Sequence, residues 1–247
     1  RRGAAASLPL FNWLKDRSAG VLLHPTSLPG AQGCGVLDQN AGRFLDFLKA
    51  AGMKYWQVCP LGPTGYGDSP YQCFSAFAGN TYLVDLAALV PAGLLDSADL
   101  APLATLSADR TDYGALYNLK PRLIEKAHAR FQKKKPALPY GDFARFCREQ
   151  ADWLEPYAYF RALKDHFKGI AWWEWPAEAR DVAKARKSPL RAQLADAIGT
   201  YQFGQYLFFG QWQAVRDAAR ARGIEIIGDL PIFVAGDSAD AWANPGL

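Results

Sequence analysis

The sequence is poor in the features that metal sites, disulfide frameworks and membrane spans require. It has four cysteines and three histidines in 247 residues, with no CxxC pair and no paired histidine spacing. Such cysteines are typical of free thiols in a reducing compartment, so we expect a cytoplasmic protein without a metal site. No apolar run approaches the ~20 residues of a membrane helix. No apolar segment follows the charged N-terminus, as a secretory signal would require.

The charge balance gives no indication of a nucleic-acid partner. The formal net charge is +4, and the densest basic run, residues 133–135, lies at the end of a helical pattern, where a solvated face explains it. With 50% hydrophobic residues the composition is that of a globular protein with a core. The GxGxxG, Walker, GxSxG and HExxH motifs are absent, so dinucleotide, triphosphate, serine-hydrolase and metalloprotease functions lose their main support.

Three apolar segments predict buried parallel strands. They span residues 20–24, 55–59 and 225–234. Between the first two, residues 41–51 carry apolar side chains at helical spacing, with Asp38 or Asn40 as N-cap and Gly52 at the stop position. The first two strands and this helix therefore form one βαβ unit. A long helix that starts at Ser188 is expected before the third strand, and the glycines within it are candidate breaks.

These elements predict an α/β protein divided into three parts. Residues 1–86 would form the first part of a (β/α) barrel and residues 87–187 a mainly helical insertion subdomain. Residues 188–247 would return to the barrel with a helix and a third core strand. Because three strands cannot close an eight-stranded barrel, we expect the chain to be part of a larger domain. A complete, open, three-stranded α/β domain is the alternative.

The loop at residues 62–79 (GPTGYGDSPYQCFSAFAG) is the strongest candidate for a binding site. It follows the second predicted strand, and loops at that end of the strands line active sites in (β/α) barrels. Its aromatic rings offer faces that stack on sugars, while Asp68, Ser69 and Gln72 offer hydrogen-bonding groups for hydroxyls. The composition indicates carbohydrate binding, although a structural Ω-loop stiffened by prolines is equally compatible with it.

Several further polar and aromatic residues admit a structural or a functional interpretation. Asp229 is a carboxylate in an apolar strand, so it either serves a site or caps backbone amides. Asp237 and Asp240 fit turn or helix-cap positions, and His128 lies among charged residues, where we expect it to be solvated. The aromatic run at residues 172–175 is expected to form subdomain core rather than a sugar platform.

Three long blocks of the sequence, in the same order, resemble the N-terminal part of 4-α-glucanotransferases, the amylomaltases or disproportionating enzymes of glycoside hydrolase family 77. The blocks are residues 18–35 (SAGVLLHPTSLPGAQGCG), 55–86 (YWQVCPLGPTGYGDSPYQCFSAFAGNTYLVDL) and 228–245 (GDLPIFVAGDSADAWANP). Residues 164–176 resemble the helical insertion of that family. The resemblance covers the chain from about residue 8, and strings of this length are far more specific than a short motif.

The resemblance implies a (β/α)8 TIM barrel with an inserted, mainly helical subdomain, of which this chain is the N-terminal portion. It implies transfer of α-1,4-glucan segments to the 4-OH of glucose or maltooligosaccharides, without a cofactor, by a retaining double displacement. The Asp nucleophile and the Glu acid/base are expected beyond Leu247, so the chain contains no catalytic residue and is expected to be inactive alone. The string at residues 165–169 resembles the nucleophile block but lacks its strand and preceding arginine.

Four residues carry over from the resemblance as substrate-binding residues. Ser69 and Tyr71 match residues that contact the acceptor-side glucan, Asp229 matches a sugar-binding carboxylate, and Tyr66 matches an aromatic residue near a second glucan site. The implied partners are maltooligosaccharides, glucose and the missing C-terminal part of the barrel, with neither nucleic acid nor membrane. A non-catalytic α-glucan-binding fragment is the alternative function, and hydrolysis of α-glucans is a third.

Overall fold

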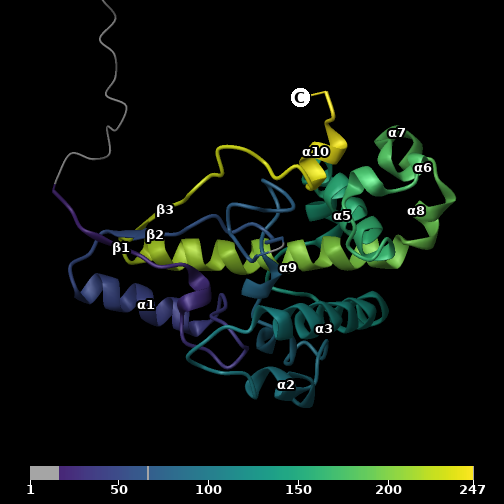
Figure 1. The fold of residues 1–247 in the computed structure, drawn as a ribbon. Helices are drawn as coiled ribbons and strands as arrows, with labels where there is room; N and C mark the ends of the chain where they lie inside the picture. The colour runs from purple at the N-terminus through teal and green to yellow at the C-terminus, as the bar shows by residue number, and fades with distance from the viewer. Residues whose placement is uncertain (1–16, 66, 247) are drawn as a thin grey trace, which may run out of the picture.

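A three-stranded parallel sheet forms one end of the protein, and helices form the other (Figure 1). The computed structural model describes residues 17–65 and 67–246. The strands are β1 (Gly20–Leu22), β2 (Tyr55–Gln57) and β3 (Glu225–Ile227), in that order across the sheet. Val21 pairs with Trp56, and Trp56 pairs with Ile226, so β2 is the central strand. The predicted parallel arrangement of three strands is confirmed.

The strands are shorter and less buried than the sequence predicts. A strand was expected over residues 225–234, but β3 ends at Ile227, and Pro231 beyond it has no N–H to donate to a sheet. Ile232 and Phe233 are 98% and 78% exposed. Only β2 is buried, because β1 and β3 are the edges of this sheet and each has a single neighbouring strand. Apolar composition alone did not separate strand from extended chain.

Helix α1 (Gln39–Ala50) joins β1 to β2, as predicted. The Asp38 carboxylate accepts a hydrogen bond from the backbone N of Asn40 at 2.7 Å, which makes Asp38 the N-cap. Gly52 follows the helix with a φ of 69°, a left-handed conformation in which a side chain would be strained. Leu45 and Leu48 are fully buried on the inner face of the helix. The βαβ unit is confirmed.

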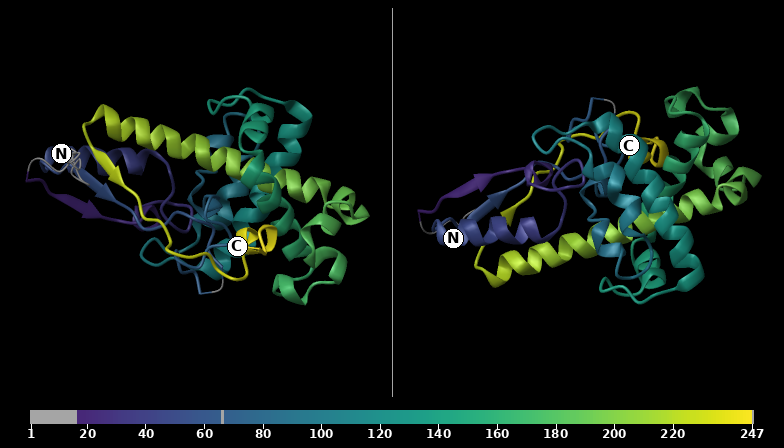
Figure 2. Two further views of the ribbon diagram at one scale, coloured as in Figure 1. Left: turned by 90° about the horizontal axis from the view of Figure 1, so that it is seen from above. Right: turned by 90° about the horizontal axis from the view of Figure 1, so that it is seen from below.

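Helix α9 (Ala195–Ala221) runs along most of the length of the protein and links the sheet to the helical region (Figures 1 and 2). It follows the short helix α8 (Pro189–Gln193), which Ser188 caps as predicted. The prediction that this helix breaks at its glycines is wrong, because α9 is continuous from Ala195 to Ala221. Gly204 and Gly210 instead let other segments come close, since a Cβ on Gly210 would lie 2.4 Å from the Tyr140 side chain. Neighbouring segments therefore use these glycines as packing sites.

The residues between β2 and α9 are mostly helical. The longer elements are α3 (Tyr113–Lys134), α4 (Phe143–Glu149) and α5 (Ala151–His166), and the shorter ones are η2 (Thr81–Leu83), η3 (Ala87–Leu89), η4 (Ser97–Leu100), α2 (Ala101–Ala104), η5 (Trp172–Glu174), α6 (Ala177–Arg180) and α7 (Val182–Ala185). Helices α4 and α5 are separate and meet at Gln150. Within residues 17–65 and 67–246, no helix combines the length and the apolar character needed to cross a membrane.

Two hydrophobic clusters hold these elements together. The first joins the sheet and α1 to α3 and α9, and the second joins α5 to α10 (Ala239–Ala243). Trp175 is buried in the second cluster, as expected of subdomain core, but Trp173 is half exposed. His128 was expected to be solvated, yet it is buried on α3, with Nδ1 3.0 Å from the Thr200 hydroxyl of α9. The helix–helix contact excludes water from this ring.

Lys120 is a fully buried cation on α3. Its ammonium donates to the carbonyl oxygens of Tyr82 at 2.5 Å and Val84 at 3.4 Å, and so holds the chain that follows the candidate binding loop. Burial lowers the pKa of this ammonium from 10.5 to about 8, because removing a charge from water favours the neutral amine.

This shift predicts a pH dependence of stability. Between pH 8 and 10.5 the unfolded chain holds the Lys120 proton and the folded chain does not, so the contribution of Lys120 to the free energy of unfolding rises with pH. In chemical denaturation, the difference in free energy of unfolding between the protein and Lys120→Met should change by about 3 kcal/mol in favour of the protein from pH 8 to pH 10.5. Lys133→Met, at the exposed end of the same helix, is the control. A pH dependence equal in both variants would contradict the prediction.

Candidate active site

The carboxyl ends of β2 and β3 bring two of the predicted site residues into contact. The Tyr71 hydroxyl donates a hydrogen bond to Oδ2 of Asp229 at 2.7 Å, although the two residues are 158 positions apart in the sequence. Tyr71 belongs to the loop at residues 62–79 that follows β2, and Asp229 comes two residues after β3. Because the two strands are parallel neighbours, both segments leave the sheet on the same side (Figure 2).

The contact between Tyr71 and Asp229 changes the acidity of the phenol. The hydrogen bond to the carboxylate, followed by desolvation, raises the pKa of Tyr71 from 10 to about 12. Asp229 is half-buried and lies beyond the end of β3, so the expectation of a carboxylate within an apolar strand is wrong. The Tyr71 side chain is 49% exposed, which leaves ring surface free for a ligand. The pair combines an aromatic face with a carboxylate held beside it.

Ser69 lies in the turn that leads to Tyr71. Its hydroxyl accepts a hydrogen bond from the backbone N of Tyr71 at 3.3 Å, and its carbonyl oxygen accepts from the backbone N of Gln72 at 3.1 Å. Asp68, just before it, has a φ of 54°, a left-handed conformation that suits a tight turn. The structure therefore brings Ser69, Tyr71 and Asp229 together. Tyr66, the fourth predicted residue, lies outside the described residues.

The loop closes on itself through its own backbone. Thr64 and Cys73 form an antiparallel bridge. The backbone N of Gly65 donates to the carbonyl of Gln72 at 3.0 Å, and the backbone N of Phe74 donates to that of Pro63 at 2.9 Å. The Ω-loop interpretation is thus correct for the backbone, and it does not exclude binding, because the closed backbone is what presents the side chains of Ser69 and Tyr71.

The segment that contains α10 forms hydrogen bonds with the backbone of the loop. The backbone N of Ala239 donates to the carbonyl oxygen of Phe74 at 2.8 Å, and Asp240 accepts from the backbone N of Ala76 at 2.9 Å. Asp237 forms an ion pair with Lys164 of α5. Ser238, and neither Asp237 nor Asp240, is the N-cap of α10. Asp237 lies in the bend before the helix and Asp240 in its first turn, and both carboxylates bind other segments.

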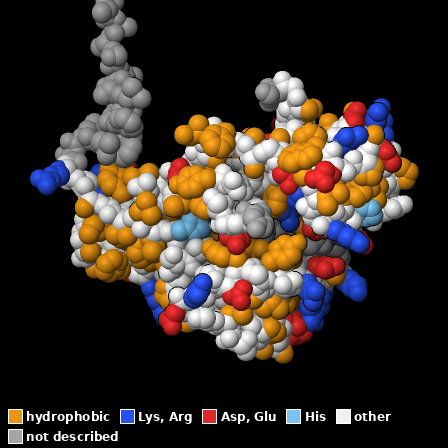
Figure 3. Space-filling view, viewed as in Figure 1, with side chains coloured by type: hydrophobic (Ala, Val, Ile, Leu, Met, Phe, Trp, Pro, Cys, Tyr) orange, Lys and Arg blue, Asp and Glu red, His pale blue; other side chains and the backbone are white. Residues whose placement is uncertain are grey.

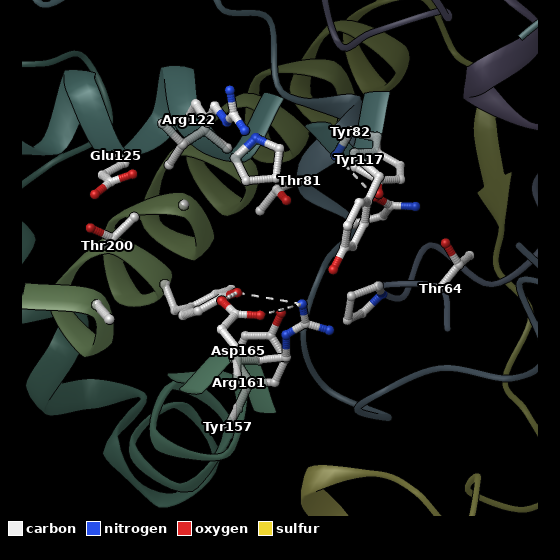
Figure 4. A pocket seen from close by; sticks show the side chains of 17 residues that line it. Thr64, Thr81, Tyr82, Tyr117, Arg122, Glu125, Tyr157, Arg161, Asp165 and Thr200 are labelled. Atoms are coloured by element: carbon white, nitrogen blue, oxygen red, sulfur yellow. Dashed lines mark hydrogen bonds and ion pairs between the residues drawn. The ribbon is translucent and has the colours of Figure 1, made fainter. Parts of the chain in front are cut away.

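Among the described residues, two cavities of more than 200 Å³ border the loop. One, of about 230 Å³, lies between the ends of β2 and β3 and α9, and includes Asp229 and Cys59 in its lining. The other, of about 250 Å³, lies between α3, α5 and α9, where Arg161 and the phenol rings of Tyr157 and Tyr201 meet (Figure 4). Among the described residues, no three His, Cys, Asp or Glu side chains come together as a metal site.

Asp165, which lines the second cavity, is not placed at the end of a strand, where residues of a (β/α)-barrel active site lie. Asp165 lies near the end of helix α5 and not after a strand. Its carboxylate accepts a hydrogen bond from the Tyr201 hydroxyl and lies 4.0 Å from the Arg161 guanidinium (Figure 4). The Arg161 guanidinium in turn lies 4.4 Å from the ring centre of Phe74, so it makes a cation–π contact with a residue of the binding loop. These contacts are those of a structural network.

Comparison with known families agrees with this arrangement. The model of glycoside hydrolase family 77, described as 4-alpha-glucanotransferase, matches residues 23–247. The chain belongs to the 4-alpha-glucanotransferase family. The resemblance that the sequence blocks indicated is therefore confirmed, and it covers both the loop at residues 62–79 and the segment that carries Asp229.

Other members of the 4-alpha-glucanotransferase family are similar over nearly all of this chain. The 4-alpha-glucanotransferase of Thermus thermophilus is 48% identical over 93% of the chain and 45% of its own length. The chloroplastic/amyloplastic enzyme of Solanum tuberosum is 41% identical over 92% of the chain and 40% of its own length. The structure of an amylomaltase from Streptococcus agalactiae in complex with acarbose, 37% identical, superimposes with a TM-score of 0.87 over 94% of the chain and 47% of its own. The chain thus spans just under half the length of these relatives.

The hydrogen bond between Tyr71 and Asp229 can be tested by titration. Asp229→Asn removes the negative charge that opposes phenolate formation, so the pKa of Tyr71 should fall from about 12 toward 10. The phenolate absorbance of the protein and of Asp229→Asn would be measured against pH, each with its Tyr71→Phe derivative subtracted to isolate Tyr71. A pKa that stays near 12 in Asp229→Asn would show that the carboxylate is not the cause.

Proposed function

We propose that this chain supplies the acceptor side of the glucan-binding cleft of a 4-α-glucanotransferase. The observation that carries the proposal is the contact between Tyr71 and Asp229 at the carboxyl ends of β2 and β3, in a chain of this family. Ligands of (β/α) barrels bind at that end of the strands. The substrates would be maltooligosaccharides and glucose, and the cellular compartment the cytoplasm.

The geometry suits recognition of a sugar ring. The exposed face of Tyr71 can stack on the apolar face of a glucose unit, and its hydroxyl is fixed by Asp229. The second oxygen of Asp229 can accept a hydrogen bond from a sugar hydroxyl, and the Ser69 hydroxyl can donate one. Together these groups would orient the acceptor so that its 4-OH, rather than water, reaches the glycosyl enzyme. Transfer would then prevail over hydrolysis.

The chemistry itself requires two carboxyl groups, which we place outside this chain. In a retaining double displacement, an Asp nucleophile forms a covalent glycosyl enzyme and a Glu acts first as acid and then as base. Both would lie beyond Leu247. We therefore propose that the 247-residue chain is inactive alone and serves at most as a non-catalytic α-glucan-binding unit. Hydrolysis by the whole domain is the competing activity, and the products separate the two, because transfer yields longer dextrins.

Exposed apolar side chains indicate where the remaining barrel would dock. Leu230, Ile232 and Phe233 follow β3, and Leu22 ends β1 at the opposite edge of the sheet; all four are more than half exposed. Figure 3 shows hydrophobic side chains gathered at the end of the molecule that holds β1 and α1. Further strands of a (β/α)8 barrel would cover both edges of the sheet and bury this surface.

Glucan binding by the chain tests the site. Isothermal titration with maltoheptaose should detect binding by the 247-residue chain, and Tyr71→Ala should weaken it by about tenfold or more, because the stacking face is lost. Tyr71→Phe keeps the ring and should lose less. Trp173→Ala, which removes an exposed aromatic ring of η5, outside the loop, is the control. Equal affinities of the chain and of Tyr71→Ala would refute the assignment of Tyr71.

A turnover assay tests whether the 247-residue chain is catalytically active by itself. Incubation of the 247-residue chain with maltotriose should release neither glucose nor longer dextrins, because we place the two carboxyl groups of a retaining mechanism outside this chain. Chromatography of the products provides the measurement, and a full-length member of the family is the positive control. Glucose together with maltopentaose in the reaction of the chain alone would show that the proposal of inactivity is wrong.

A further inference from the structure

Gln205 binds both backbone groups of a single loop residue. This fully buried side chain of α9 accepts a hydrogen bond from the backbone N of Gly79 at 2.7 Å and donates one to the carbonyl oxygen of Gly79 at 2.9 Å. Gly79 is the last residue of the loop at residues 62–79. A buried backbone N–H and C=O need partners, and here one side-chain amide supplies both.

Gln211, which lies further along α9, makes the same pair of hydrogen bonds to another residue. Its amide accepts from the backbone N of Asp85 at 2.8 Å and donates to the carbonyl oxygen of Asp85 at 3.0 Å. The two glutamines are six residues apart on the helix, as are Gly79 and Asp85 in the segment that follows the loop. The helix thus holds this segment at two points, of which only Gly79 belongs to the loop.

Close packing against Phe208 also fixes the position of Gly79. A Cβ on this residue would lie 2.0 Å from the ring of Phe208, so only glycine allows the backbone to lie this close to α9. The ring of Phe208 limits movement toward the helix, and the amide of Gln205 limits movement away from it. The end of the loop therefore has one position relative to α9, and through α9 relative to β3 and Asp229.

We propose that Gln205 is a positioning residue that fixes the C-terminal end of the loop at residues 62–79, and thereby holds Tyr71 against Asp229. The consequence for glucan affinity rests on the proposed function, whereas the consequence for the contact between Tyr71 and Asp229 does not. Gln211 is also a buried glutamine that binds both backbone groups of one residue, and it donates in addition to the Tyr140 hydroxyl at 3.2 Å. Because the residue it holds lies outside the loop, it is a control within the chain.

The test compares Gln205→Met with Gln211→Met in the 247-residue chain. Methionine keeps the length of the side chain and removes both hydrogen bonds. Hydrogen exchange of the backbone amides of Phe74 and Gly79 should become about tenfold faster or more in Gln205→Met, because the loop end opens more often. In Gln211→Met the increase should be confined to Asp85 and its neighbours.

A spectroscopic readout distinguishes positioning from general destabilisation. In Gln205→Met the pKa of Tyr71 should fall from about 12 toward 10, because the hydroxyl is held less often against Asp229, whereas Gln211→Met should leave it unchanged. Maltoheptaose affinity should weaken about tenfold in Gln205→Met alone. Failure of the unaltered chain to bind maltoheptaose would count against the proposed function, and the Tyr71 titration would still decide the role of Gln205.

Unchanged loop exchange and an unchanged Tyr71 titration in Gln205→Met would overturn the proposal. Equal effects of both variants on the loop would overturn it as well, since Gln205 would then only stabilise the fold. Should Gln205→Met fail to fold, Gln205→Asn is the second variant. The Asn amide is uncharged and one methylene shorter, so it cannot span both backbone groups of Gly79 as Gln205 does. A smaller loosening confined to the loop is expected, and the absence of any loosening would refute the proposal.

Discussion

The parallel pairing of β2 with β3 is the constraint on which the candidate site depends. The register sets Trp56 opposite Ile226, and from there each chain continues for only a few residues before it reaches the loop at residues 62–79 or Asp229. Parallel strands send their carboxyl ends to the same edge of a sheet, so two segments remote in sequence meet there. The hydrogen bond from Tyr71 to Asp229 is the direct result of this pairing.

The helical region acts as a support for the loop rather than as a separate layer. Arg161 of α5 lies over the ring of Phe74, Asp240 of α10 binds the backbone of Ala76, and Gln205 of α9 binds that of Gly79. Each contact comes from a different helix, and each acts on a different residue in the second half of the loop. A loop rich in glycine has high conformational entropy when free, so several anchors are needed to give it one conformation.

Two buried lysines of the helical region hold chain segments. Lys120 donates to the carbonyl oxygens of Tyr82 and Val84, and Lys164 binds Asp237 and the carbonyl of Ile170. A buried charge is costly unless hydrogen bonds compensate it. Carbonyl oxygens provide that compensation for Lys120, whereas Lys164 has a carbonyl oxygen and the Asp237 carboxylate. Lys120 thereby connects α3 to the segment that follows the loop, and Lys164 connects α5 to the segment that leads into α10.

The sequence by itself determined the local elements, the family and the chemical type of the site residues. Helical spacing, the Asp38 cap and Gly52 are signals within a few neighbouring residues, and the loop at residues 62–79 is recognisable from its composition and its family resemblance. Only the tertiary structure decided that Tyr71 bonds to Asp229 and that Gln205 holds Gly79, because these contacts cross 158 and 126 residues. Periodicity and capping carry no information on which distant polar groups meet; that depends on strand order and on the path of α9.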